Sequence, residues 1–135
     1  MAVFGPPESL PDFEVVACRT TAEAAGCNLA WIPEGSRVDG RRLRKDLDRR
    51  GVPLASTSDT VPDGVAALSV LPDPESLGRR AAALVLGHLR DRKPVAPVAA
   101  VSRLRVTIDL RAARAAGHAV PLPALARADA VRRGR

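Results

Sequence analysis

Short apolar segments alternate in this chain with segments of helical periodicity, and no other feature of the sequence limits the fold more. The segments 13–19, 27–33 and 65–71 are nearly continuous in hydrophobic residues, which is typical of strands buried on both faces of a parallel sheet. Helical patterns occupy 38–50 and 73–93. This order predicts an α/β domain with a mostly parallel sheet flanked by helices.

Shorter or weaker patterns complete the prediction. The additional regular elements are a helix at 20–25, strands at 52–56 and 104–110, and helices at 111–116 and 122–132. The strand at 104–110 alternates apolar and polar residues, so we expect it to be half-buried, at an edge of the sheet. The irregular segments are a loop or strand end at 1–12, a Pro-containing connector at 94–100 and a frayed tail at 132–135.

The segment 73–93 has the clearest helical pattern. Asp73 suits the N-cap, because its carboxylate accepts from free N–H groups of the first turn, and Pro74 fits the next position. One face of this helix is apolar and is formed by Leu77, Ala81, Leu84, Val85 and Leu89. We expect this apolar stripe to fold back on the sheet, or to contact a second copy or a partner protein.

Composition excludes several classes of protein. The 135 residues suffice for one domain and are too few for two ordinary ones. Two cysteines exclude a disulfide scaffold and a four-cysteine zinc site. No apolar run reaches the roughly 20 residues that span a bilayer, and no signal peptide is recognisable. We therefore expect a soluble chain without an export signal of its own.

Three sequence motifs carry a resemblance to a known family. They are GVAALSVLPDPESLGRRAAALVLGHLRDRKPV, RVTIDLRAARAAGHAVP and LPALARADAV, with looser support from NLAWIPEGS and GVPLAST. The pattern resembles the substrate-binding proteins of ABC transporters, including tryptophan- and tyrosine-type periplasmic receptors. Asp109 stands where that family usually has Asn. The resemblance covers nearly all of this chain but corresponds only to the carboxyl-terminal half of a family member.

The resemblance implies one lobe of a type I periplasmic binding protein. It further implies binding of a small solute, such as an amino acid or related carboxylate, with an ABC permease as partner and a periplasmic location. The first lobe would be supplied by a partner or by self-association. No cofactor is implied.

Candidate ligand-binding residues follow the predicted strands, because ligands of open α/β sheets collect at the carboxyl ends of the strands. They are Pro33, Glu34, Ser36, Ser56, Thr57, Ser58 and Asp73. Hydroxyls and backbone amides there can hold a carboxylate, and Glu34 or Asp73 an amino group. The simpler interpretation is that 56–59 only turns the chain and that Asp73 only caps its helix. Trp31 either stacks on a ligand or fills the core.

Other functions have weaker support. His88 and His118 belong to no catalytic or metal-binding motif, so we expect neither an enzyme nor a metal protein. The net charge of +6 and the arginines of 41–50 and 132–135 suit nucleic acid, but Asp39, Asp46 and Asp48 interrupt the patch and aromatic residues are scarce. The main alternative is an interaction or regulatory domain that has lost solute binding and uses the apolar stripe of 73–93.

Overall fold

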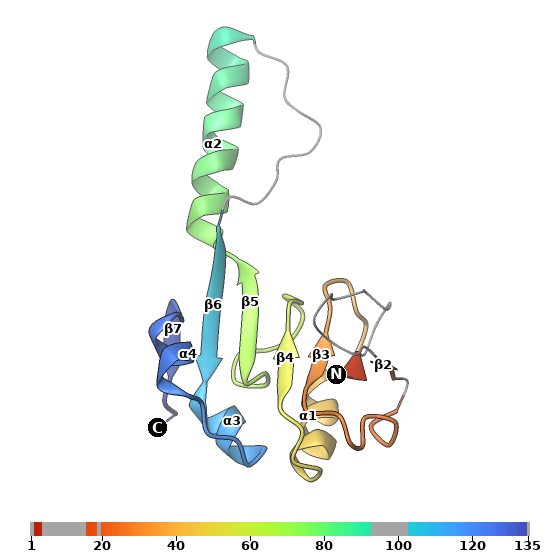
Figure 1. Cartoon of the computed structure of the whole chain (residues 1–135). Helices are drawn as coiled ribbons and strands as arrows, with labels where there is room; N and C mark the ends of the chain where they lie inside the picture. Colours follow the sequence, from red (N-terminus) through yellow and green to blue (C-terminus); the bar gives the residue numbers. More distant parts are fainter. Residues whose placement is uncertain (1, 4–15, 19, 93–102, 135) are drawn as a thin grey trace.

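The computed structural model describes residues 2–3, 16–18, 20–92 and 103–134. Within these residues the strands form one seven-stranded sheet in the order β2-β1-β3-β4-β5-β6-β7 (Figure 1). Their bounds are β1 Ala2–Val3, β2 Val16–Ala17, β3 Ala30–Ile32, β4 Leu54–Ser56, β5 Leu68–Pro72, β6 Leu104–Asp109 and β7 Ala130–Arg132. Only β5 and β6 pair antiparallel, so the predicted mostly parallel α/β sheet is confirmed.

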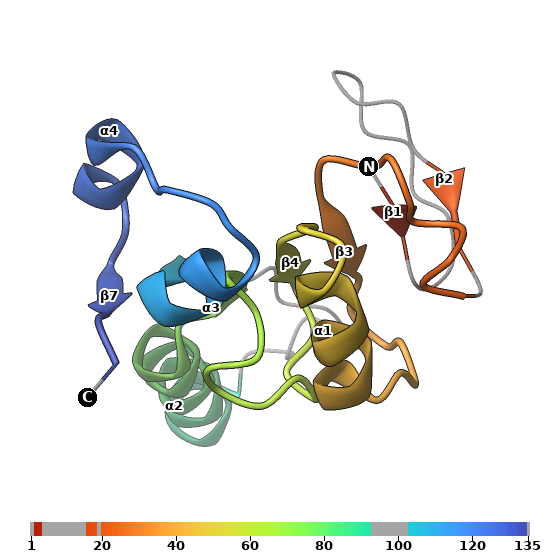
Figure 2. The same ribbon diagram turned by 90° about the horizontal axis from the view of Figure 1, so that it is seen from below.

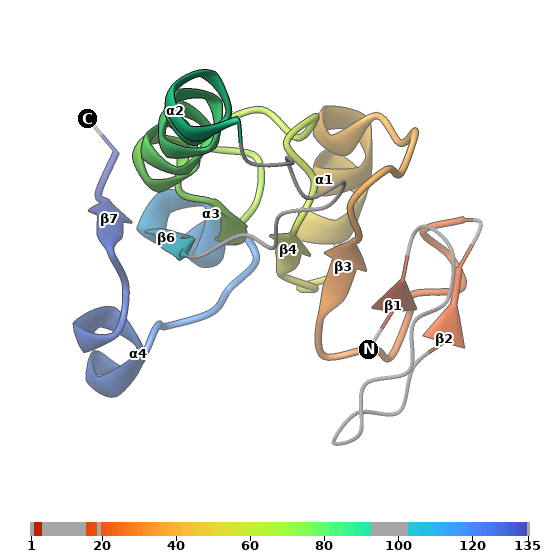
Figure 3. The same cartoon turned by 90° about the horizontal axis from the view of Figure 1, so that it is seen from above.

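Helix α1, Gly40–Asp48, attaches to the sheet through a narrow apolar seam. Asp39 caps it by accepting from the backbone N–H groups of the first turn. Leu43 and Leu47 are the buried large side chains of the helix, and Leu47 has no exposed surface. They join the main core cluster, which contains Ile32 from β3 and Leu54 from β4. Figures 2 and 3 show α1 on one side of the sheet and α4, Leu122–Ala126, on the other.

Helix α2, Pro74–Asp91, stands beyond the end of the sheet (Figure 1). The Asp73 carboxylate accepts from the N–H of Ser76 at 3.2 Å, which confirms the predicted cap. None of the helix residues is buried: the exposed fraction is 47% for Leu77, 55% for Val85 and 72% for Leu89. The apolar stripe therefore does not fold back on the sheet within the described part of the chain.

Three predictions at the level of single elements were wrong. Residues 20–25 form a turn instead of a helix, since Cys27 donates to Ala24 in an i to i−3 bond and Gly26 has φ +88°. Strand β6 is not at an edge, because β7 pairs with its outer side. The third wrong prediction concerns β7 itself, because its residues were predicted to be the end of a helix at 122–132 and the start of a frayed tail.

The outer strand β7 is held in the sheet by backbone pairing with β6, and none of its side chains is fully buried. Its register joins Thr107 to Ala130 and Ile108 to Val131. Helix α4 is shorter than predicted and ends at Ala126. Helix α3, Leu110–Ala115, is capped by Asp109 and ends before Gly117, which has φ +77°.

Some predictions lie outside the described residues. These are positions 4–15 of the predicted loop at 1–12 and strand at 13–19, and the connector at 94–100. In the ranges that are described, we find no helix long and apolar enough to span a bilayer.

Candidate functional site

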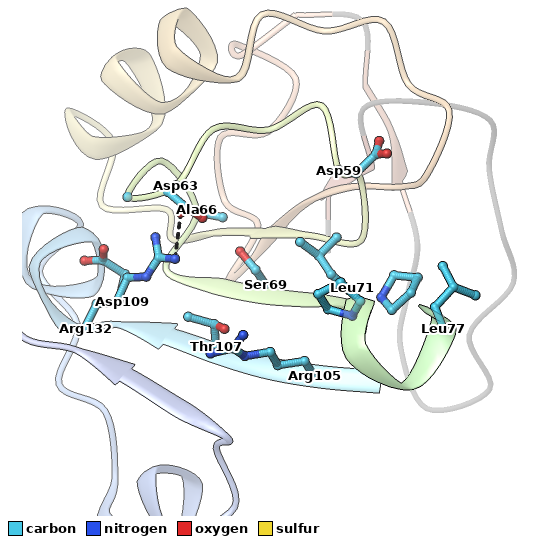
Figure 4. Close-up of a pocket in the computed structure, with 13 residues that line it drawn as sticks. Asp59, Asp63, Ala66, Ser69, Leu71, Leu77, Arg105, Thr107, Asp109 and Arg132 are labelled. Carbon is cyan, nitrogen blue, oxygen red and sulfur yellow. Dashed lines mark ion pairs between the residues drawn. The ribbon is translucent and has the colours of Figure 1, made fainter. Parts of the chain in front are cut away.

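A pocket of about 430 Å³ lies along one face of the antiparallel β5/β6 ribbon (Figure 4). Because alternate residues of a strand share a face, Ser69 and Leu71 on β5 point to the same side. Their cross-strand neighbours on β6 are Thr107 and Arg105. All four side chains line the pocket. The ribbon thus supplies two hydroxyls, one guanidinium and one apolar group to a single surface.

An ion pair closes one end of this pocket. The Arg132 guanidinium lies 2.7 Å from the Asp63 carboxylate, shown by the dashed line in Figure 4. The hydrogen bond from Arg132 holds the pKa of Asp63 below its usual value, and the same contact raises the pKa of Arg132. The Asp63 side chain is 81% exposed, so the pair adds little stability. Its structural effect is to orient the guanidinium at the pocket.

Two opposite charges in the pocket form no direct ion pair among the described residues, although Arg105 acts at longer range on Asp63 and Asp129. Arg105 on β6 and Asp59 in the loop after β4 make no hydrogen bond or ion pair between their side chains and other described residues. A guanidinium binds a carboxylate well because its planar fork matches the two oxygens. A carboxylate accepts equally well from an ammonium group. The pocket lining therefore presents one guanidinium and one carboxylate that are not paired with each other.

The end of the pocket nearest α2 is apolar. Leu71, Pro72, Pro74 and Leu77 line it, and Leu77 comes from the first turns of the helix (Figure 4). Small-molecule sites commonly combine such a wall with a few placed polar groups, in volumes of roughly 300–1,000 Å³. The arrangement suits a compact solute with an apolar portion beside its charged groups.

The predicted site residues at the end of β4 and after it are engaged in hydrogen bonds, Ser56 and Ser58 with residues of their own loop and Thr57 with Trp31 on β3. Ser56 and Ser58 are buried, and the Ser56 hydroxyl accepts from the Ser58 N–H at 3.0 Å. The Ser58 hydroxyl lies 2.7 Å from that of Thr60. Thr57 accepts from the Trp31 indole N–H at 3.2 Å. These contacts shape the turn, and none of these three predicted residues lines the β5/β6 pocket.

The remaining predicted residues occupy other positions. Pro33 is buried, Glu34 is exposed, and the buried Ser36 hydroxyl has no hydrogen-bond partner among the described residues. Asp73 caps α2 and faces a small polar hollow that also contains Arg105. Ligand binding by these residues stays a prediction.

Five polar residues of the pocket were not predicted as site residues: Asp59, Asp63, Arg105, Thr107 and Arg132. A signal was present in the alternation of 104–110, which places Arg105, Thr107 and Asp109 on one polar face of a strand. That face was assigned to solvent, whereas in the structure all three side chains line the pocket. The ion pair between Asp63 and Arg132 joins residues far apart in the sequence, so no local pattern indicated it.

The geometry includes no metal centre: in the ranges that the structure covers, no cluster of His, Cys, Asp and Glu could hold an ion. Comparisons with protein families, with curated proteins and with solved structures gave no match.

Proposed function

We propose that this chain is a small-solute binding module, half of a two-lobe receptor for an amino acid or related carboxylate. The observation that carries the proposal is the β5/β6 pocket, where Arg105 and Asp59 offer unpaired opposite charges beside an apolar wall. The resemblance to ABC transporter substrate-binding proteins supports the same function. That resemblance also implies an ABC permease as partner and a periplasmic location.

The pocket and α2 together indicate where a second lobe would lie. The pocket opens beside the first turn of α2, and Leu77 belongs both to its lining and to the apolar stripe. A lobe that covered the stripe would therefore also reach the pocket. Burial of the solute between two surfaces would exclude water from the Arg105 guanidinium and strengthen its interaction with a carboxylate.

Thermal unfolding against a panel of amino acids and small organic acids tests the proposal. A solute at 100 times its Kd adds about 2.7 kcal/mol, which moves the midpoint by several degrees in a chain of this size. We expect a saturable rise with one solute class, and loss of that rise in Arg105→Gln. Arg114→Gln is the matched control, since this exposed arginine lies on α3 outside the pocket. The proposal fails if no solute raises the midpoint, or if both variants respond equally.

The exposed stripe of α2 favours a second candidate function, an interaction domain that pairs with another copy of itself. An antiparallel pair of α2 helices would bury both stripes. The stripe is continuous from Leu77 to Leu89, so a second copy offers a matching apolar surface of the same length.

The apolar stripe provides a matched pair of variants for this candidate. Leu84 lies in the stripe, whereas Leu86 is 64% exposed on the opposite face of α2. If the helix pairs, Leu84→Asp abolishes a concentration-dependent dimer in sedimentation velocity and Leu86→Asp preserves it. If the chain is monomeric at all concentrations tested, self-pairing is excluded. The thermal-unfolding measurements with amino acids and organic acids then decide on solute binding by themselves.

A further inference from the structure

A second hollow, of 720 Å³, lies between α1, the turn before β5, the start of α3 and the strand β7. Figure 2 shows α1 and β7 on either side of the chain segment that leads into β5. Five cationic side chains and three carboxylates line this hollow, and no aromatic side chain does. The cationic excess sets it apart from the β5/β6 pocket. We refer to it as the basic hollow.

Two of the carboxylates are paired with two of the cations. Arg44 donates from Nε to Asp48 at 3.1 Å, and a second nitrogen of the same guanidinium donates to the Gly64 carbonyl. Arg132 is paired with Asp63 at 2.7 Å. Both guanidiniums are thereby fixed in position. Each keeps further N–H donors, since a guanidinium has five.

The third carboxylate is engaged by backbone. Asp109 is buried and accepts from the N–H of Ala112 at 2.8 Å, where it caps α3. The side chains of Arg41, Lys45 and Arg111 form no ion pair with other described residues. Because Asp109 keeps its negative charge, the five cations and three carboxylates of the lining leave a net charge of +2 in the basic hollow.

The three cations without ion pairs line the same space. Arg41 and Lys45 lie one turn apart on α1, opposite the buried Leu43 and Leu47 that anchor the helix. On the other side, the stem of Arg111 packs against the backbone of Gly134. A Cβ at Gly134 would lie 3.3 Å from Arg111 Cδ, a tight contact to which the Arg111 stem would have to adjust.

We propose that the basic hollow binds a small phosphoanion with two or more phosphate groups. Guanidinium groups match phosphate oxygens in bidentate geometry, and fixed donors lose little freedom on binding. A net charge of +2, with three cations free of ion pairs among the described residues, exceeds what one carboxylate needs. The absence of aromatic side chains from the lining removes the stacking surface that single-stranded nucleic acid uses, which favours a compact anion. The basic hollow shares Asp63, Gly64, Asp109 and Arg132 with the lining of the β5/β6 pocket, but Arg41, Lys45 and Arg111 line the basic hollow alone.

Titration calorimetry with inorganic pyrophosphate at low ionic strength tests the site. We expect saturable binding, weakened about tenfold for each charge removed, in Arg111→Gln and in the double variant Arg41→Gln/Lys45→Gln. The replaced side chains are exposed, so the variants keep their fold, which circular dichroism and the unliganded unfolding midpoint check. Citrate, with three carboxylates, should bind more weakly than pyrophosphate.

Two controls separate a specific site from general attraction. Arg79→Gln/Arg80→Gln removes the same charge from α2, remote from the basic hollow, and should leave the pyrophosphate Kd unchanged. Arg105→Gln should also leave it unchanged, so failure here is distinct from failure of the solute pocket. The proposal is overturned if pyrophosphate does not bind, or if the α2 double variant loses as much affinity as the α1 double variant. It is also overturned if pyrophosphate does not bind but an oligonucleotide does, and if Arg111→Gln and Arg41→Gln/Lys45→Gln weaken the binding of that oligonucleotide.

Discussion

Truncation of Leu47 to alanine tests whether the narrow seam of α1 holds this helix on the sheet. The Leu47 side chain is fully buried among the residues of the main core cluster. Losing three buried carbons removes roughly 2.4 kcal/mol of transfer free energy at about 0.8 kcal/mol per methylene, and the cavity left behind raises the total to about 3–4 kcal/mol. For a chain of this size the unfolding midpoint should fall by roughly 10 °C.

Thermal unfolding followed by circular dichroism measures this effect, with Leu86→Ala as the control. Leu86→Ala removes the same three carbons from a residue that is 64% exposed, and substitutions at the surface usually change the stability by no more than about 0.5 kcal/mol. A fall in midpoint of similar size in both variants would refute the reasoning, because it would show that burial at Leu47 does not determine the loss. So would an unchanged midpoint in Leu47→Ala.

Two further predictions concern single carboxylates. Asp109→Ala removes the cap of α3 and should destabilise the chain by about 1 kcal/mol, whereas Asp109→Asn keeps an accepting oxygen and should cost much less; equal losses in chemical denaturation would contradict this. The Val106 N–H, and secondarily Arg103, hold the pKa of Asp129 below its usual value. Its charge therefore stabilises the fold above the ordinary carboxyl pKa of about 3.9, and this contribution disappears as the pH falls through the lowered pKa. Accordingly, Asp129→Asn should unfold earlier than the unmodified chain at neutral pH and equally in strong acid; a constant gap would contradict the assignment.

The sequence correctly predicted those helices and strands for which the capping residues and the hydrophobic pattern indicate the same element. Asp73 precedes a helical pattern and caps its helix as predicted, whereas Asp39 lay inside the predicted helix 38–50 and its capping of α1 was not predicted. The apolar segment 27–33 contains β3, with Ala30 and Ile32 buried as expected. The segment 65–71 contains most of β5, which is half-buried and not buried on both faces as predicted. Strand β7 escaped prediction because three residues that include Arg132 have no strand periodicity. It exists through pairing with β6, a contact between segments that sequence patterns do not join.

The β5/β6 pocket was harder to predict than the sheet. The rule that ligands collect after parallel strands directed attention to the loops after β3 and β4, where Ser56 and Ser58 turned out to bond within their loop. The pocket instead uses the polar face of the ribbon. Its existence depends on β6 running antiparallel to β5, and the direction of a strand is set by long-range topology rather than by residues such as Arg105 and Thr107.

The antiparallel register of β5 and β6 has a consequence for how this chain tolerates change. Pro72 pairs with Leu104, and the Asp73 N–H donates to the Arg103 carbonyl at 3.0 Å, so the chain leaves and re-enters the sheet at neighbouring positions. Whatever is inserted between those positions leaves the strand order and the main core untouched. A tight hairpin turn could replace α2, or a different domain could be grafted there. The helix is in this sense an exchangeable attachment at the tip of a hairpin, which evolution or an engineer can alter separately from the sheet.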